Sequence, residues 1–142
     1  MKHRIFVYGT LKKGFPNHAR YMQSAEKLGD YRTVESYPLV LIGERCVPCM
    51  INAPGKGEQI EGELYEVDDE CLERLDALER IKEPDGYRRL KINVEPSGKH
   101  HAKALEAHAY LIPPKIAKNR RSDYLGIYGL EEAKKYNPAK KR

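Results

Sequence analysis

Residues 3–14 read HRIFVYGTLKKG. The first part, His3–Tyr8, consists largely of good β-forming residues and is typical of a short strand that enters a hydrophobic core. Two glycines, Gly9 and Gly14, then interrupt the run and predict a loop whose backbone turns sharply. Successive N–H groups in such a turn can surround an anionic oxygen, either a carboxylate or a developing oxyanion. We therefore expect a buried strand followed by an anion-binding loop. The loop is not the phosphate loop of nucleotide hydrolases, because Phe15 follows the second glycine where that motif requires Lys-Ser or Lys-Thr.

Length and composition predict a small globular protein. The chain has 142 residues and a mass of 16.3 kDa, which is the usual size of one domain. We expect a single domain over residues 1–142, with a basic irregular tail from about residue 113. Hydrophobic residues make up 40% of the chain and the mean hydropathy is −0.74, which is polar but sufficient for a core. An intrinsically disordered chain is therefore excluded.

The cysteines and the hydropathy profile indicate the compartment. No apolar run approaches the ~20 residues that cross a bilayer, and the N-terminal residues do not form a signal peptide. We therefore expect no membrane partner. Three cysteines, an odd number, favour a reduced, cytoplasmic setting. Cys46 and Cys49 form a Cys-x-x-Cys, but a strand is expected around them, which fits neither a thioredoxin-type site nor a zinc site. We interpret them as structural.

Positive charge gathers in the last third of the chain. The net charge is +5, and residues 99–142 carry 11 Lys and Arg against four acidic residues. Nucleic-acid binding through this tail is one hypothesis. However, the basic runs Lys118–Arg121 and Lys140–Arg142 are short and lack interleaved aromatic residues for base stacking. We expect a solvated tail, no nucleic-acid partner, and a surface role for the His100–His101 pair.

The rest of the chain predicts short strands and one clear helix. A helix is expected from Asp68 or Asp69 to about Arg80, with acidic residues in its first turn. One or two helical turns are expected within residues 16–23, and a short helix near residues 130–135. Further strands are predicted at residues 28–34, 39–42, 47–51, 59–67, 87–94 and 108–112. This pattern favours an α+β class, a small and mostly antiparallel β-barrel with one main flanking helix.

One carboxylate lies on the apolar side of the expected helix. Cys71, Leu72, Leu75 and Leu78 form a stripe at helical spacing, and Glu79 falls on the same stripe. Burial raises the pKa of a carboxyl group and suits it to proton transfer near neutral pH. The alternative is that Glu79 lies in a frayed last turn, exposed to solvent or paired with Arg88 or Arg89. Periodicity alone leaves both interpretations open.

Several segments together resemble one enzyme family. Residues 6–18, FVYGTLKKGFPNH, are similar to the opening signature of the gamma-glutamyl cyclotransferase-like superfamily, in the branch that contains gamma-glutamylamine cyclotransferase. The resemblance continues over nearly the whole chain, at Tyr37–Val40, Gly62–Val67, Leu75–Glu79 and Tyr136–Pro138.

The resemblance implies a small β-barrel enzyme that uses neither a cofactor nor a metal. Its reaction releases an amine from a gamma-glutamyl amine, such as gamma-glutamyl-epsilon-lysine, while the glutamyl part cyclises to 5-oxoproline by lyase or acyl-transfer chemistry. In this interpretation the substrate's own α-amine attacks its γ-carbonyl, and Glu79 is the catalytic acid and base. The expected substrate-binding residues are Tyr8, Gly9, Thr10, Leu11 and Tyr87, with the two tyrosines closing the pocket and supplying hydroxyl hydrogen bonds.

The same sequence features are compatible with two other functions. The leaving group could instead be an α-amino acid, or cysteinylglycine from glutathione, in which case a cation would be expected near it. The possible suppliers are Lys115, Lys118, Arg120 and Arg121. Alternatively, the chain could be a binding module for a small acidic metabolite or a protein partner, without turnover. We expect a monomer or a weak dimer.

Four more side chains have expected roles near the site. His18 is expected either to help shape the pocket or, as we favour, to cap a turn after Pro16-Asn17, and Asp76 is expected to anchor a neighbouring backbone N–H. Arg88 and Arg89 are adjacent strand residues, so at most one of them is expected to reach the pocket.

Overall fold

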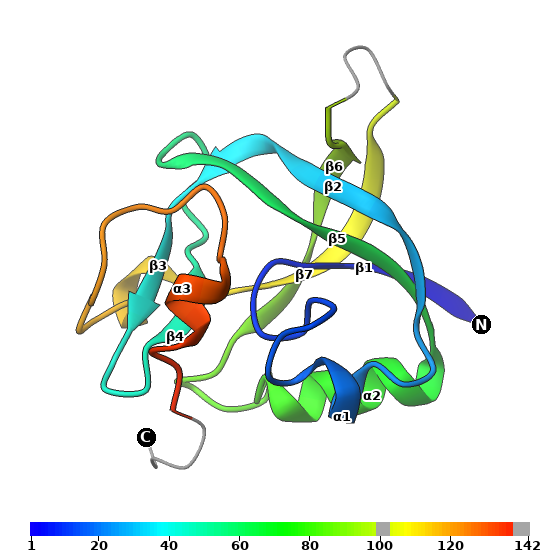
Figure 1. Ribbon diagram of the computed structural model, residues 1–142, viewed down its shortest axis with the longest axis horizontal. Coiled ribbons are helices and arrows are strands. Elements are labelled where there is room, and N and C mark those ends of the chain that lie inside the picture. Colours follow the sequence, from blue (N-terminus) through cyan, green and yellow to red (C-terminus); the bar gives the residue numbers. More distant parts are fainter. Residues whose placement is uncertain (99–102, 138–142) are drawn as a thin grey trace.

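Five strands close into a barrel in the order β1-β5-β2-β6-β7, as the computed structural model shows for residues 1–98 and 103–137 (Figure 1). All pairs are antiparallel except β1 with β7, which is parallel. The predicted α+β class, a mostly antiparallel barrel, is confirmed. His100–His101 and Lys140–Arg142 lie outside the described residues. The barrel strands are β1 (Lys2–Val7), β2 (Glu26–Tyr37), β5 (Glu58–Asp68), β6 (Arg88–Pro96) and β7 (Leu105–Leu111).

A hairpin and four helical segments complete the fold. The hairpin pairs β3 (Leu39–Ile42) with β4 (Val47–Met50) outside the barrel. The main helix is α2 (Asp69–Leu78), and single turns form α1 (His18–Tyr21), η1 (Pro114–Ile116) and α3 (Leu130–Ala133). Each predicted element exists, although β2 and β7 begin earlier than expected and α2 ends two residues before Arg80. No helix among the described residues is long and apolar enough to cross a membrane.

Alternation along β1 separates two parts of the core. Phe6 points into the barrel with Leu64, Ile92 and Ala109, whereas Ile5 packs on the outer side with residues of α2. Gly62 of β5 makes room for β1, because a Cβ atom at this position would lie 2.5 Å from the Val7 carbonyl oxygen. The end of β1 is therefore held between two packed layers, and the loop that follows it starts from a fixed point.

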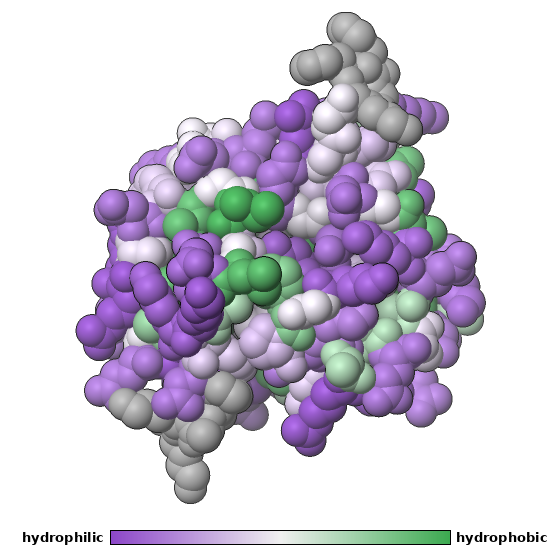
Figure 2. Space-filling model, viewed as in Figure 1, coloured by the Kyte–Doolittle hydropathy of each residue, from purple (hydrophilic) through white to green (hydrophobic). Residues whose placement is uncertain are grey.

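The basic segment after β7 is irregular, as predicted, but it is bonded to the hairpin and the barrel. Arg121 N–H donates to Leu41 O at 2.7 Å, and Leu125 N–H donates to Leu39 O at 2.8 Å. Glu61 N–H of β5 in turn donates to Gly126 O at 2.9 Å. The face seen in Figure 2 is mainly hydrophilic, with small hydrophobic groups near α3. The segment is thus a fixed wall of the molecule beside the hairpin.

Helix α2 begins at a side-chain cap and buries one face. The Asp68 carboxylate accepts a hydrogen bond from Cys71 N–H at 2.8 Å, and Asp69 and Glu70 place further negative charge in the first turn. Cys71, Leu72 and Leu75 are buried against the barrel. The predicted apolar stripe is therefore the face that anchors this helix.

We predict that Asp68→Ala lowers the free energy of unfolding by about 1 kcal/mol, because the substitution removes the cap. Urea denaturation monitored by circular dichroism measures the change. Asp68→Asn keeps a side-chain acceptor and is the matched control, with a loss of a few tenths of a kcal/mol at most. Equal losses in the two variants would show that the cap does not hold this helix end.

Candidate functional site

A cleft opens where the end of β1, the end of α2 and the start of β4 meet. All six residues expected at the site from the sequence line this cleft: Tyr8, Gly9, Thr10, Leu11, Glu79 and Tyr87. The structure adds residues that the sequence reasoning did not single out: Asn17, Arg45, Val47, Pro48, Tyr110 and Tyr136. Among the described lining residues, Glu79 is the one carboxylic acid and Arg45 the one cation. The cleft therefore pairs a single acid with a loop of main-chain donors.

Internal hydrogen bonds fix the loop after β1. Lys12 N–H donates to Gly9 O at 3.1 Å, and Asn17 N–H donates to Thr10 O at 2.8 Å. The Asn17 side-chain amide also donates to the Thr10 hydroxyl at 2.8 Å. Within the described chain, the N–H groups of Gly9, Thr10 and Leu11 donate no hydrogen bond. The loop is rigid, and its three remaining donors are available to a ligand.

Further contacts, two of them with distant parts of the chain, support the same loop. Lys12 is only 4% exposed, and its ammonium group donates to Tyr128 O at 2.5 Å and lies 4.4 Å from the centre of the Phe15 ring. Lys13 N–H donates to the Glu63 carboxylate at 2.8 Å. His18 Nδ1 lies 2.9 Å from Leu11 O. His18 begins α1, and its N–H donates to Phe15 O at 3.1 Å, which closes the turn at Pro16-Asn17, while its ring contacts the loop at Leu11.

Glu79 is held by its backbone on both sides. It is the C-cap of α2, and its N–H donates to Leu75 O at 2.9 Å while its carbonyl accepts from Tyr87 N–H at 3.0 Å. The next residue, Arg80, has a φ of 54° and donates to Ala77 O at 3.2 Å. Ile81 N–H donates to Asp76 O at 3.3 Å, which completes a Schellman-type helix end. The half-buried Glu79 side chain thus leaves the helix at a defined point instead of a frayed turn.

Three buried tyrosines surround the acid. Burial raises the pKa of Tyr8, Tyr87 and Tyr110 above the ordinary value, and the negative charge of Glu79 raises each of them further. All three hydroxyls are therefore neutral at physiological pH. Each hydroxyl also donates its proton in a hydrogen bond within the protein. Tyr8 donates to Tyr110 O at 2.7 Å, Tyr87 to Pro48 O at 2.8 Å, and Tyr110 to the Asp76 carboxylate at 2.7 Å.

These bonds correct the expected role of the tyrosines. Tyr8 and Tyr87 line the cleft as expected, but their hydroxyl protons are directed at backbone carbonyls and not toward a ligand. The Tyr8 oxygen in addition accepts from Met50 N–H at 3.2 Å. The two side chains therefore connect β4 to the rest of the cleft wall and keep it in place.

A polar network behind the cleft joins α2 to β6 and β7. Asp76 accepts from the Arg89 guanidinium at 2.9 Å and from the Tyr110 hydroxyl at 2.7 Å. The expectation that Asp76 anchors a backbone N–H is wrong, because its carboxylate binds two side chains, those of Arg89 and Tyr110. Neither Arg88 nor Arg89 lines the cleft, since Arg88 donates to carbonyls of its own turn, including Gly86 O at 2.8 Å.

The opposite wall comes from the hairpin turn and the end of the described chain. Arg45 donates to the Tyr136 hydroxyl at 3.2 Å and to Asn137 O at 3.1 Å, and Asn137 N–H donates back to Arg45 O at 3.1 Å. The Asn17 amide reaches the same Tyr136 hydroxyl at 3.4 Å. Arg45 lies within the turn between β3 and β4 and in no periodic pattern, so the sequence offered no signal for it. Tyr136 could have been found only through its place in the Tyr136–Pro138 tripeptide.

The thiols take structural positions. Cys46, Cys49 and Cys71 form no disulfide, and the Cys49 sulfur lies 3.1 Å from the Tyr87 hydroxyl. In the part of the chain that the structure describes, no three His, Cys, Asp or Glu side chains come together as a metal site would require.

We predict that Gly86→Ala disturbs the position of Glu79. A Cβ atom at residue 86 would lie 1.9 Å from the Arg80 carbonyl oxygen, so the turn after α2 must shift. Overpacking of this kind costs about 1–3 kcal/mol of unfolding free energy, measured by urea denaturation. Lys82→Ala, an exposed change in the same turn, should stay within about 0.5 kcal/mol of the wild type. If both variants were as stable as the wild type, the close approach of Gly86 would have no energetic role.

We predict that acid weakens the network behind the cleft through His108. Burial, followed by the positive charges of Arg89 and Lys91, lowers the pKa of His108 below 6.5. Folded His108 therefore binds fewer protons than the unfolded chain, and stability falls as the pH drops below about 6.5 through the folded pKa. Protonation also opposes the 3.1 Å contact between His108 Nδ1 and the Arg89 guanidinium.

The measurement is the free energy of unfolding between about pH 7.5 and about pH 5. His108→Gln removes the titrating ring, so the wild type should lose more stability over this range than the variant does. Parallel curves for the two proteins would assign the acid sensitivity to other groups.

Comparison with known proteins places these features in one family. A family model described as "Gamma-glutamyl cyclotransferase, AIG2-like" matches residues 5–129. The chain is similar to "Gamma-glutamylaminecyclotransferase B" of Danio rerio, with 46% identity over 95 residues, which cover 64% of this chain and 49% of the relative. It is also similar to "Gamma-glutamylaminecyclotransferase" of Homo sapiens, with 41% identity over 95 residues, 64% of this chain and 61% of the relative. The matched part thus spans about half to three-fifths of these curated relatives.

Solved structures share the fold over nearly the full chain. The crystal structure of an AIG2-like protein from Mus musculus has a TM-score of 0.82 and 33% identity, and the match covers 99% of each chain. An uncharacterised protein from Pyrococcus horikoshii has a TM-score of 0.64 and 27% identity, with 93% of this chain and 94% of that one covered. With the barrel, the loop after β1 and the match over residues 5–129, the chain belongs to the AIG2-like gamma-glutamyl cyclotransferase family.

Proposed function

We propose that this protein is a gamma-glutamylamine cyclotransferase, which releases an amine from a gamma-glutamyl amine and forms 5-oxoproline. The observation that carries the proposal is the shared cleft of Glu79 and the loop Tyr8–Leu11, whose N–H groups are available. The resemblance of the chain to proteins named gamma-glutamylaminecyclotransferase favours the amine, and not a free α-amino acid, as the leaving group.

The substrate supplies its own nucleophile. Its α-amine lies on the same carbon skeleton as the γ-carbonyl, so attack closes a five-membered ring, with the advantage of a tethered reaction. The α-nitrogen forms a bond to the γ-carbonyl carbon, and the bond from this carbon to the leaving nitrogen breaks. The reaction requires no enzyme thiol or hydroxyl as nucleophile and no redox partner.

Glu79 has the role of proton carrier. The α-amine is mostly protonated at neutral pH, so its nitrogen loses one proton before it attacks and a second one as it becomes the ring amide. The leaving nitrogen gains one proton to depart and a second to become an ammonium ion. One carboxylate can carry these protons in turn from the α-nitrogen to the leaving nitrogen. The backbone hydrogen bonds of Glu79, to Leu75 O and from Tyr87 N–H, keep this residue in the wall of the cleft during the proton transfers.

The loop after β1 binds the negative charge. Its N–H groups at Gly9, Thr10 and Leu11 suit either the substrate α-carboxylate or the oxyanion of the tetrahedral intermediate. The three tyrosines contribute apolar ring surface and are not needed as donors. We place the reaction in the reducing cytoplasm, which the free thiols favour, and we expect a protein that works as a monomer or weak dimer.

We predict that Glu79→Gln lowers kcat by about 10²- to 10⁴-fold, because the amide cannot accept or return a proton. The assay follows 5-oxoproline released from a panel of gamma-glutamyl amines, gamma-glutamyl amino acids and glutathione. Glu73→Gln, on the exposed face of the same helix, is the matched control and should keep wild-type activity. Thermal unfolding of all three proteins checks that folding is retained.

Two results would contradict the proposal. Wild-type turnover by Glu79→Gln would remove this residue from the mechanism. A wild-type protein that releases no 5-oxoproline from any member of the panel would favour a binding module over an enzyme.

A further inference from the structure

The cleft contains two sets of hydrogen-bond donors, and we propose that they bind different parts of the substrate. Arg45, together with the Tyr136 hydroxyl, binds the α-carboxylate of the gamma-glutamyl group. The N–H groups of the loop after β1 then bind the oxyanion. This division of roles rests on the proposed function, in which a gamma-glutamyl amine cyclises to 5-oxoproline.

The Arg45 guanidinium has donors left for a ligand. It lines the cleft, and it donates through Nε to Asn137 O at 3.1 Å and through Nη2 to the Tyr136 hydroxyl at 3.2 Å. A guanidinium has five N–H groups, so three of them donate no hydrogen bond within the described chain. Because Nε is already used, a carboxylate would bind the edge formed by Nη1 and Nη2, through two parallel hydrogen bonds.

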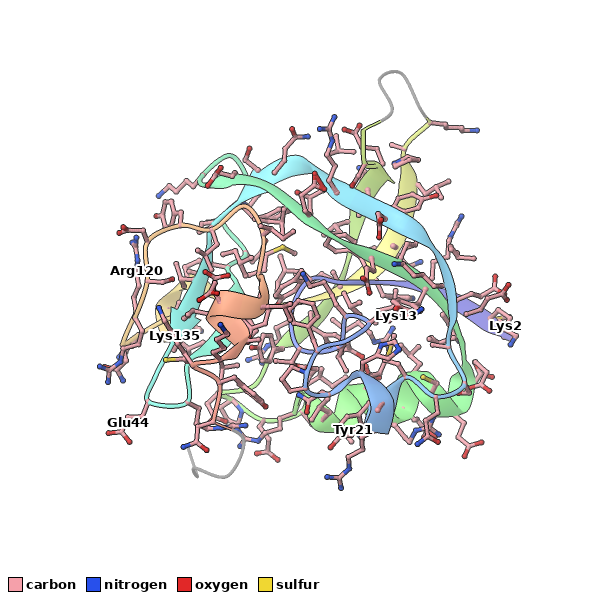
Figure 3. The ribbon with its side chains drawn as sticks, in the orientation of Figure 1. Lys2, Lys13, Tyr21, Glu44, Arg120 and Lys135 are labelled. Atoms are coloured by element: carbon pink, nitrogen blue, oxygen red, sulfur yellow. The ribbon has the colours of Figure 1, made fainter. Side chains whose placement is uncertain are left out.

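The positive charge of Arg45 also favours an anionic ligand. In residues 1–98 and 103–137, no Asp or Glu lies within ion-pair distance of its guanidinium. Glu44, its neighbour in the hairpin turn, is exposed, projects outward and does not line the cleft (Figure 3). The cations that the sequence offered for a carboxylate on the leaving group lie outside the cleft: Lys115, Lys118, Arg120 and Arg121. A substrate carboxylate in the cleft is therefore attracted mainly to half-buried Arg45.

Tyr136 differs from the other tyrosines of the cleft. Its hydroxyl oxygen accepts from the Arg45 guanidinium at 3.2 Å and from the Asn17 amide at 3.4 Å, and within the described residues the hydroxyl itself donates no hydrogen bond. The hydroxyls that already donate within the protein belong to Tyr8, Tyr87 and Tyr110. A carboxylate bound at Arg45 can therefore accept a further hydrogen bond from Tyr136.

The fold fixes the position of Arg45 before a ligand binds. Asn137 N–H donates to Arg45 O at 3.1 Å, which reciprocates the bond from the Arg45 side chain, and Cys46 N–H donates to Gly43 O at 3.0 Å across the turn. Figure 1 shows this turn, between β3 and β4, beside the segment that follows α3. Binding therefore orders few additional groups on this wall, which reduces its entropic cost.

The substrate presents two negative groups on opposite sides of one nitrogen. In the five-membered ring, the attacking nitrogen lies between the α-carbon, which bears the carboxylate, and the former γ-carbonyl carbon, which bears the oxyanion. Donors on two different walls of the cleft suit this arrangement. The permanent charge of the carboxylate matches the permanent charge of Arg45. The charge that develops on the oxyanion is best stabilised by preorganised donors, such as the N–H groups of Gly9, Thr10 and Leu11.

The experiment compares two amides of the same amine, chosen as the best leaving group in the panel. One is the gamma-glutamyl amide. The other is the 4-aminobutanoyl amide, which keeps the nucleophilic amine and the carbonyl but lacks the α-carboxylate, and which cyclises to 2-pyrrolidinone. Release of the amine measures turnover of both, and inhibition of the first reaction by the second amide measures its Ki. We expect the wild type to bind the gamma-glutamyl amide more tightly.

Variants of the carboxylate site test the assignment. Arg45→Gln should raise KM for the gamma-glutamyl amide by about 10- to 100-fold, with a smaller change in kcat, because charged hydrogen bonds to the carboxylate are lost. The same variant should leave the Ki of the 4-aminobutanoyl amide near the wild-type value. Arg45→Lys keeps the charge without the planar fork and should give an intermediate KM. Tyr136→Phe should raise KM by about 3- to 10-fold, because one hydrogen bond is lost.

A matched control and a folding measurement accompany these variants. Arg20→Gln removes the same charge from an exposed position outside the cleft and should keep the wild-type KM and Ki. Thermal unfolding identifies any variant that does not fold. If Arg45→Gln does not fold, the KM values of Arg45→Lys and Tyr136→Phe decide the question.

The possible failures are distinguishable. An equal loss of binding for both amides in Arg45→Gln would show that Arg45 only supports the cleft wall, and an unchanged KM would show that it does not bind the substrate. Either result, or equal binding of the two amides by the wild type, would overturn the inference and leave the proposed function standing. Absence of 5-oxoproline from every gamma-glutamyl compound of the panel would overturn the proposed function and the inference with it.

Discussion

The hydrogen bond from Tyr87 N–H to Glu79 O joins the end of α2 to the start of β6, and the geometry of the cleft depends on it. A C-terminal helix residue that projected into solvent would be free to fray. Here the chain turns at Arg80 with a positive φ, and Gly86 lies so close to the Arg80 carbonyl that no larger residue fits. The barrel therefore determines where the helix ends, and the helix end determines where the carboxylate lies.

The loop after β1 is fixed by a separate set of bonds, which come from elements far apart in the sequence. Lys12 is buried and bonded to Tyr128 O, and Lys13 N–H is bonded to Glu63. A buried ammonium group is costly to desolvate, as the lowered pKa of Lys12 reflects. The buried Lys12 side chain joins the loop to the segment around Tyr128, far away in the sequence. The two halves of the site are thus rigid for independent reasons, and neither requires the ligand to organise it.

Local patterns were sufficient to predict much of the fold, whereas the central residues of the cleft were predicted with the help of the family resemblance. Alternation predicted β5 and capping residues predicted α2. The apolar stripe marked Glu79 as a candidate but left open whether it is buried or exposed. Hydrogen-bond direction could not be predicted, because it depends on which carbonyl a distant strand presents. The Tyr8 hydroxyl bonds to Tyr110 O, 102 residues away in sequence. Arg45 reaches the cleft only because the hairpin folds against Tyr136, a contact without any periodic trace.

The distribution of protons in the cleft explains why one carboxylate is sufficient for the proposed proton transfers. The tyrosine hydroxyls have raised pKa values and donate to the protein, so they neither gain nor lose a proton near neutral pH. The backbone N–H groups of the loop do not titrate at all. Among the described lining residues this leaves Glu79 as the one carboxylic acid, with Arg45 permanently charged. A site with one acid and several fixed donors suits the proposed reaction, in which protons move between two nitrogens while negative charge develops on an oxygen.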